Sequence, residues 1–187
     1  AFVTAAGARL GGLVLAANAV LMNMLALISF ALDGFAHAAE ALVGKAVGAK
    51  NKKALQQTVR LALKWSLYVS VLLSLFFISG GKILIRLLTD LPGVIEIANQ
   101  YLPWLYVLPL IGVWSYLYDG VFVGATRARE MRDIMLIASF AVFLPSWYIF
   151  QELGNHGLWL AVTIFLASRG IGMHYFYKTR VLTSLST

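Results

Sequence analysis

Residues 10–32, LGGLVLAANAVLMNMLALISFAL, are 23 consecutive residues without a charged side chain. An α-helix needs about 20 apolar residues to cross the hydrocarbon core of a bilayer. The helical pattern continues to Val47, and at about 1.5 Å per residue such a helix exceeds the hydrocarbon thickness, so we expect it to tilt or to protrude. The stretch therefore predicts a transmembrane helix over residues 10–47.

The composition of the whole chain is also that of a membrane protein. Hydrophobic residues make up 60% of the 187 residues and charged residues 12%, and the mean hydropathy is +0.81. A soluble domain has roughly 45–50% apolar and about 25% charged residues. The apolar runs predict an all-α, polytopic helical bundle with four further spans, at approximately 56–79, 94–125, 134–150 and 158–177. Residues 1–9 are apolar but too short to span, and we expect them to be the end of a truncated transmembrane helix.

Glycine, proline and charged residues mark the expected ends and irregularities of these spans. Gly80 and Gly81 predict a break, followed by a short amphipathic helix over 82–88 at the membrane interface. Residues 127–133 are rich in charge and predict a connector, and the Asn-His-Gly sequence at 155–157 predicts a tight turn. Pro103 and Pro109 lie inside the third span and are expected to bend it, because each removes a backbone hydrogen bond.

Basic residues gather on one side of the predicted spans. Alternation of the loops places ten on that side, namely Lys45, Lys50, Lys52, Lys53, Arg60, Arg127, Arg129, Arg132, Lys178 and Arg180. The other side holds only Arg9, Lys82 and Arg86. The positive-inside rule then predicts a multi-pass protein of the inner (plasma) membrane with a cytoplasmic C-terminus. The net charge of +7 is explained by this topology, so no nucleic-acid partner is expected.

Ionisable side chains inside the first span are candidates for function, because each is costly in hydrocarbon and normally faces a partner or a cavity. Asp33, His37 and Glu40 stand at i, i+4 and i+7 and are expected to share one helix face. Two acids on either side of an imidazole suit a proton or cation relay; the alternatives are an interhelical hydrogen-bond ladder, or a Glu40 wetted at the cytoplasmic end. One helix supplies too few ligands for a metal, and the chain has no cysteine, so neither a metal site nor a cofactor is expected.

Two further charged residues lie in later spans. Asp119 follows a long apolar stretch and precedes Gly120 and Gly124, and we expect it either to pair with a base or to line an aqueous cavity. Arg169 is a possible charge partner for an acid, or a side chain that reaches to the interface, as is expected of Lys64. The Gly-x-x-x-Gly spacings 44/48 and 120/124 favour close helix packing.

Three stretches carry a family likeness, namely 7–23 (GARLGGLVLAANAVLMN), 33–51 (DGFAHAAEALVGKAVGAKN) and 119–133 (DGVFVGATRAREMRD). They resemble the multidrug and toxic compound extrusion (MATE) family, and its DinF-like branch in particular. The resemblance implies half of a twelve-helix transporter, namely its C-lobe, with residues 1–9 as the tail of helix 7 and the rest as helices 8 to 12. It implies cation coupling at Asp119, which matches the family's acidic position in the tenth helix. Asp33 and Glu40 belong to the DinF-like pattern of the eighth helix.

The expected function is secondary antiport, in which an amphipathic or cationic drug or metabolite leaves in exchange for H⁺ or Na⁺. The expected partners are that small molecule, the lipid bilayer and a missing N-terminal lobe. One alternative is a flippase for lipid-linked saccharides or peptidoglycan precursors, whose cavity should carry Arg and Lys for a pyrophosphate. Another is a structural membrane subunit without transport, which has no reason to bury three acids. No nucleophile–base arrangement indicates an enzyme.

Overall fold

A computed structural model describes residues 11–183, and the prediction for residues 1–9 lies outside this part of the chain. The described residues are almost entirely helical, and five stretches are long and apolar enough to cross a membrane. The sequence-based fold class, an all-α polytopic bundle, is confirmed. The elements are α2 (Gly12–Gly48), α3 (Lys52–Leu88), α4 (Pro92–Gly124), α5 (Ala128–Ile137), η1 (Ala138–Phe143), α6 (Leu144–Phe150), η2 (Gln151–Leu153), α7 (Asn155–Phe176) and η3 (Tyr177–Val181).

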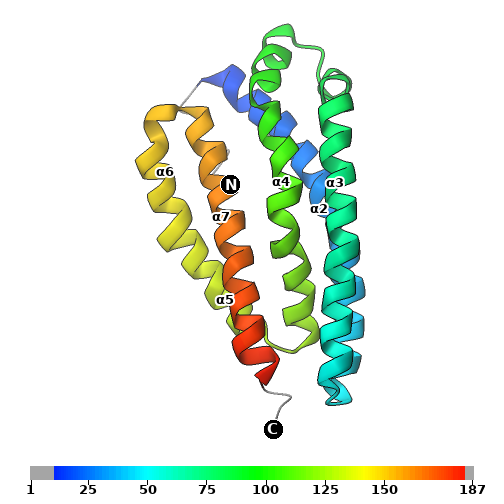
Figure 1. Cartoon of the computed structure of the whole chain (residues 1–187). Coiled ribbons are helices and arrows are strands. Elements are labelled where there is room, and N and C mark those ends of the chain that lie inside the picture. Colours follow the sequence, from blue (N-terminus) through cyan, green and yellow to red (C-terminus); the bar gives the residue numbers. More distant parts are fainter. Residues whose placement is uncertain (1–10, 184–187) are drawn as a thin grey trace.

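The long helices run side by side, and α4 lies at the centre of the bundle (Figure 1). It packs against α2 and α3 on one side and α7 on the other, and its contact with α2 is the most extensive in the molecule. The stretch from α5 to α6 flanks α7 on the outside. Many leucine, isoleucine and aromatic side chains are exposed on the outer faces, which would be unfavourable in water but is not in lipid.

The predicted break at Gly80 and Gly81 is wrong, because α3 continues without interruption to Leu88. A glycine inside a helix costs only about 1 kcal/mol relative to alanine, so packing can override it. Here Gly81 is buried against Leu102 of α4, and a Cβ at this position would lie 2.9 Å from the Leu102 side chain. The glycine therefore permits close packing of α3 on α4, and residues 82–88 are part of the same long helix.

The fourth span begins earlier than predicted and contains a wide turn. Residues 128–133, expected in a connector, already belong to α5. The π-helical turn η1 follows α5 and ends just before Pro145, which lies in the first turn of α6. Proline has no N–H and its ring clashes with the carbonyl four residues earlier, and such positions commonly produce π-bulges and kinks.

α2 and α4 both end at the lower side of Figure 1, and they do so in the same way. After α2, Lys50 adopts a positive φ of 49°, and after α4, Thr126 adopts 56°. In both, the next amide bonds back to a carbonyl five residues earlier, from Asn51 to Ala46 and from Arg127 to Phe122. This is the pattern of a Schellman-type helix end. The turn predicted at 155–157 lies instead at Gly154 (φ 56°), and Asn155 already begins α7.

A buried amide pair joins the upper ends of α2 and α7. The side chains of Asn18 and Asn155 donate to one another at 2.7 and 2.9 Å, and the Trp159 indole N–H donates to Asn18 Oδ1 at 3.1 Å. All three residues are buried. The network fixes the first turns of α7 against α2, and so helps to set the position of α7 farther down.

Replacing Asn18 by leucine is expected to lower the melting temperature, because the Asn155 amide and the Trp159 N–H lose their partner inside the bundle. An unsatisfied buried polar group costs about 1–3 kcal/mol. Asn23→Leu on the same helix is the matched control, since Asn23 is exposed. Thermal unfolding of the detergent-solubilised protein measures the effect, and equal melting of the two variants would contradict the structural role given to Asn18.

Candidate functional site

Asp119 of α4 and Arg169 of α7 form an ion pair within the bundle. Arg169 Nη2 donates to Asp119 Oδ2, and the two side chains are 11% (Arg169) and 30% (Asp119) exposed. Asp119 Oδ1 and Arg169 Nε are buried and have no hydrogen-bond partner among the described residues. Of the two expectations for Asp119, pairing with a base is therefore the one the structure shows. Arg169 is an acid's partner and does not extend to the interface.

Asp33 of α2 lies on the same side of the bundle as this pair. It is half-buried and close enough to interact electrostatically with Asp119 and with Tyr116, one turn above Asp119 on α4. The Tyr116 hydroxyl forms a 2.7 Å hydrogen bond with Ser29, one turn before Asp33. We call Ser29, Asp33, Tyr116, Asp119 and Arg169 the polar cluster; it contains two carboxylates and one guanidinium.

Glycine brings the two acid-bearing helices together. A Cβ at Gly120 would lie 1.9 Å from the Ala36 carbonyl oxygen, and one at Gly124 would lie 2.3 Å from that of Glu40. The 120/124 spacing therefore allows α2 and α4 to touch backbone to backbone, as the sequence predicts. The 44/48 pair differs: a Cβ at Gly44 would lie 3.4 Å from the Gly124 carbonyl oxygen, and one at Gly48 would meet nothing within 4 Å.

His37 and Glu40 do not join the polar cluster. They pair with one another at 3.6 Å between His37 Nδ1 and Glu40 Oε2, and their side chains are 79% and 41% exposed. Because α2 is a continuous α-helix, Asp33, His37 and Glu40 lie along one face as expected, but of the three only Asp33 interacts with Asp119 and Tyr116. A coupling role for Glu40 stays a prediction. Lys64 is exposed, with its ammonium 5.9 Å from the Tyr68 ring, as expected of a side chain that reaches away from the core.

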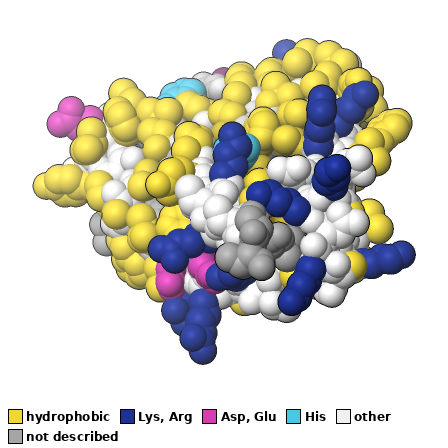
Figure 2. Space-filling model, turned by 60° about the horizontal axis from the view of Figure 1, so that its bottom comes forward, with side chains coloured by type: hydrophobic (Ala, Val, Ile, Leu, Met, Phe, Trp, Pro, Cys, Tyr) yellow, Lys and Arg dark blue, Asp and Glu magenta, His cyan; other side chains and the backbone are white. Residues whose placement is uncertain are grey.

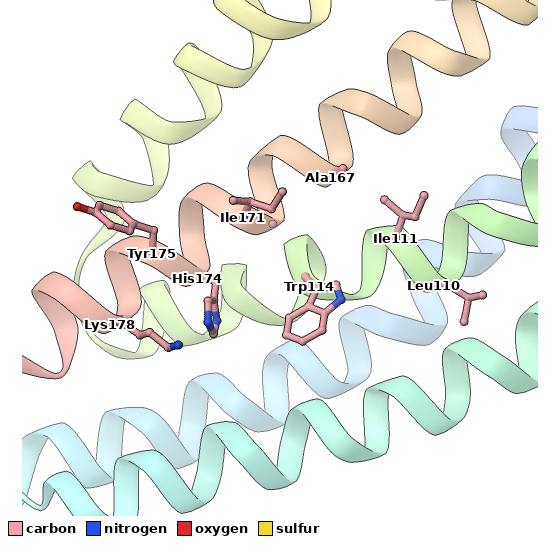
Figure 3. A pocket seen from close by; sticks show the side chains of 9 residues that line it. Leu110, Ile111, Trp114, Ala167, Ile171, His174, Tyr175 and Lys178 are labelled. Atoms are coloured by element: carbon pink, nitrogen blue, oxygen red, sulfur yellow. The ribbon is translucent and has the colours of Figure 1, made fainter.

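A pocket of about 640 Å³ lies between α4 and α7 (Figure 3). Its upper part is aliphatic, and Trp114, His174, Tyr175 and Lys178 line its lower part. The His174 imidazole stands edge-on to Trp114, and its Nδ1 lies 2.6 Å from the Tyr118 hydroxyl. None of the residues of the polar cluster lines this pocket, so the two are separate features of the α4–α7 interface.

Sequence reasoning missed Ser29 and Tyr116 of the cluster and the Tyr118–His174 pair. A signal did exist for the first two, because Ser29 precedes Asp33 by four residues and Tyr116 precedes Asp119 by three, which places each hydroxyl on the face of its acid. Among the described residues, no three His, Cys, Asp or Glu side chains gather in a way that could hold a metal ion.

A sequence model of the MatE family matches residues 1–149. The chain is 46% identical over 91% of its length to "DNA damage-inducible protein F" of Escherichia coli (strain K12), and 24% identical over 92% to "Probable multidrug resistance protein NorM" of Photorhabdus laumondii. It spans 37% and 40% of the length of these relatives. The crystal structure of the eukaryotic MATE transporter AtDTX14 superposes on 92% of the chain with a TM-score of 0.83 and 16% identity, and 39% of that structure is covered.

Proposed function

The chain belongs to the MatE family and has the fold of half of such a transporter, and on this premise we propose that it is the C-lobe of a secondary antiporter. The substrate that we propose is an amphipathic or cationic drug or metabolite, exported in exchange for H⁺ or Na⁺. The relative named as a probable multidrug resistance protein supports an efflux role.

One observation carries the proposal: the polar cluster has two carboxylates and a single guanidinium. The carboxylates of Asp33 and Asp119 are close enough to repel one another, whereas the Arg169 guanidinium pairs with Asp119 and can neutralise only one of the two. With both acids ionised, the cluster has one negative charge in excess, within a bundle of largely apolar helices. An uncompensated charge in a bilayer costs at least about 2.5–3.5 kcal/mol on insertion scales. One bound proton or Na⁺ removes this excess.

The ion pair also gives a route from ion binding to movement. A proton or Na⁺ on Asp119 weakens its attraction for Arg169, which is carried by α7, whereas Asp119 is carried by α4. Ion binding thus changes the free-energy difference between two arrangements of these helices, and a ligand shifts such an equilibrium by its differential affinity for the two states. Coupling to substrate requires that the substrate prefer the other arrangement.

The flippase alternative has less support in the charges. A site for a pyrophosphate needs several cationic groups, whereas of the basic side chains expected away from the ends of the spans, Arg169 is committed to Asp119 and Lys64 is exposed. A purely structural subunit has no use for the excess carboxylate, and replacing Asp33, Glu40 and Asp119 together would leave its assembly intact.

We further propose that the lower end of the bundle in Figure 1 is cytoplasmic. Figure 2 shows this end, where Lys and Arg side chains outnumber Asp and Glu. Exposed basic residues of the two lower connections and of the C-terminal segment include Lys50, Lys53, Arg129, Lys178 and Arg180. The positive-inside rule supports a cytoplasmic position for these loops and for the C-terminus.

Coupled transport is tested with the intact protein in liposomes. We expect a fluorescent organic cation to be moved against its gradient when an opposing pH or Na⁺ gradient is imposed, and not when the gradient is collapsed by an ionophore. Separate imposition of the two gradients identifies the ion. Equal movement of the cation with and without either gradient would exclude antiport.

A further inference from the structure

The pocket between α4 and α7 has a polarity that changes along its length. Leu110, Ile111, Ala167 and Ile171 line the end nearer the middle of the helices. His174, Tyr175 and Lys178 line the end nearer the C-terminus of the chain. Figure 3 shows the Lys178 side chain extending beside His174 at this end. A ligand that fits both ends has an apolar body and a polar head.

The ionisable groups at the polar end favour an acidic head. None of the described residues that line the pocket is acidic, whereas Lys178 carries a positive charge and is exposed. The Tyr118 hydroxyl is hydrogen-bonded to Nδ1 of His174, which leaves Nε2 as the ring nitrogen that a ligand could reach. A basic pocket between transmembrane helices on the cytoplasmic side is the kind of site that binds acidic lipid headgroups.

The size of the pocket also matches a lipid. Its lining on α7 and η3 extends from Ala167 to Lys178, which is about 16 Å along the axis at about 1.5 Å per residue. The hydrocarbon core of a bilayer is about 30 Å thick, so the pocket is about as long as one leaflet. Ile171 and Tyr175 are 71% and 62% exposed, so the pocket is open at the surface of the part of the chain that the structure describes. Lys178 lies near the end of the last span, at the level of a headgroup.

We propose that this pocket binds a phospholipid with an acidic headgroup from the cytoplasmic leaflet, with an acyl chain along Ala167 and Ile171 and the headgroup phosphate at Lys178. The orientation given above is the one part of the proposed function that this inference needs. The polar cluster takes no part in it, and loss of lipid binding and loss of coupled transport are separate results.

Native mass spectrometry of the intact protein tests the proposal, with phosphatidylglycerol and phosphatidylcholine of identical acyl chains as probes. The unaltered protein should retain phosphatidylglycerol in preference. Lys178→Gln should reduce retained phosphatidylglycerol by about fivefold, the factor expected for one basic side chain at a headgroup. Lys53→Gln is the matched control: Lys53 is exposed, carries the same charge and does not line the pocket, and its replacement should leave retention unchanged.

A second variant tests the apolar end. Ala167→Phe should fill the pocket and reduce retention of both lipids, because the acyl chain loses its place. Equal phosphatidylglycerol retention by Lys178→Gln and Lys53→Gln would overturn the headgroup assignment. Unchanged retention by Ala167→Phe would overturn the acyl-chain assignment, and is the result expected if another segment of the intact protein covers this pocket.

Discussion

Replacing Asp119 by asparagine is expected to abolish gradient-driven transport. The amide keeps the shape of the side chain but cannot take up a proton or neutralise a cation, and the cluster is left with one carboxylate and one guanidinium, which already balance. No excess negative charge remains to attract an ion. Uptake of the fluorescent cation in liposomes should fall to the level measured without a gradient. Glu96→Gln is the matched control, because Glu96 is an exposed acid on the same helix.

A double variant separates coupling from folding. Asp119→Asn alone leaves Arg169 largely buried without its acid. Removing one partner of a buried ion pair destabilises a protein by about 3–5 kcal/mol. The cost should be smaller here, because Asp119 is 30% exposed and solvent screens the charge. Asp119→Asn with Arg169→Gln removes both charges and should melt closer to the unaltered protein. Asp33 then remains as an unpaired acid within the polar cluster, but the double variant should still not couple, because the ion pair that links ion binding on α4 to movement of α7 is gone. Coupled uptake at the normal rate by a well-folded double variant would show that the pair is structural only.

The charged members of the polar cluster could be predicted from the sequence, but the way they come together could not. Charged residues within apolar runs are few, so Asp33, Asp119 and Arg169 are conspicuous in the sequence. The pairing of Asp119 with Arg169 could not be predicted. The two residues are 50 positions apart, and they belong to helices whose relative rotation is set by packing. His37 and Glu40 lie on the same helix face as Asp33, but in the structure their side chains are exposed and pair with one another, which the sequence spacing alone does not reveal.

The same distinction applies to the fold. The existence of the spans follows from hydropathy, because an uninterrupted run of about 20 apolar residues is the mark of a transmembrane helix. The ends and irregularities depend on neighbours that the local sequence does not reveal. Gly81 looks like a break but accommodates Leu102, and Asn155 looks like part of a turn but begins α7 within the amide pair with Asn18. In each case a tertiary contact outweighed a local preference of about 1 kcal/mol.

Gly120→Ala is expected to lower both stability and coupled transport although it alters no charge. The added Cβ would lie 1.9 Å from the Ala36 carbonyl oxygen, a backbone atom that cannot rotate away, so α2 and α4 must separate. Overpacking of this kind typically costs about 1–3 kcal/mol. Ala36 is one turn from Asp33 and Gly120 is next to Asp119, and the separation therefore pulls the two carboxylates apart.

Gly34→Ala provides the control for this effect, because Gly34 is adjacent to Asp33 and a Cβ there would meet nothing within 4 Å. Alanine at an open helical position should be neutral or stabilising by up to about 1 kcal/mol. Thermal unfolding in detergent and uptake in liposomes should then rank Gly34→Ala at or above the unaltered protein and Gly120→Ala below it in both measurements. A Gly120→Ala protein that melts lower but couples normally would mean that the distance between Asp33 and Asp119 is unimportant, and that Asp119 and Arg169 alone carry the ion.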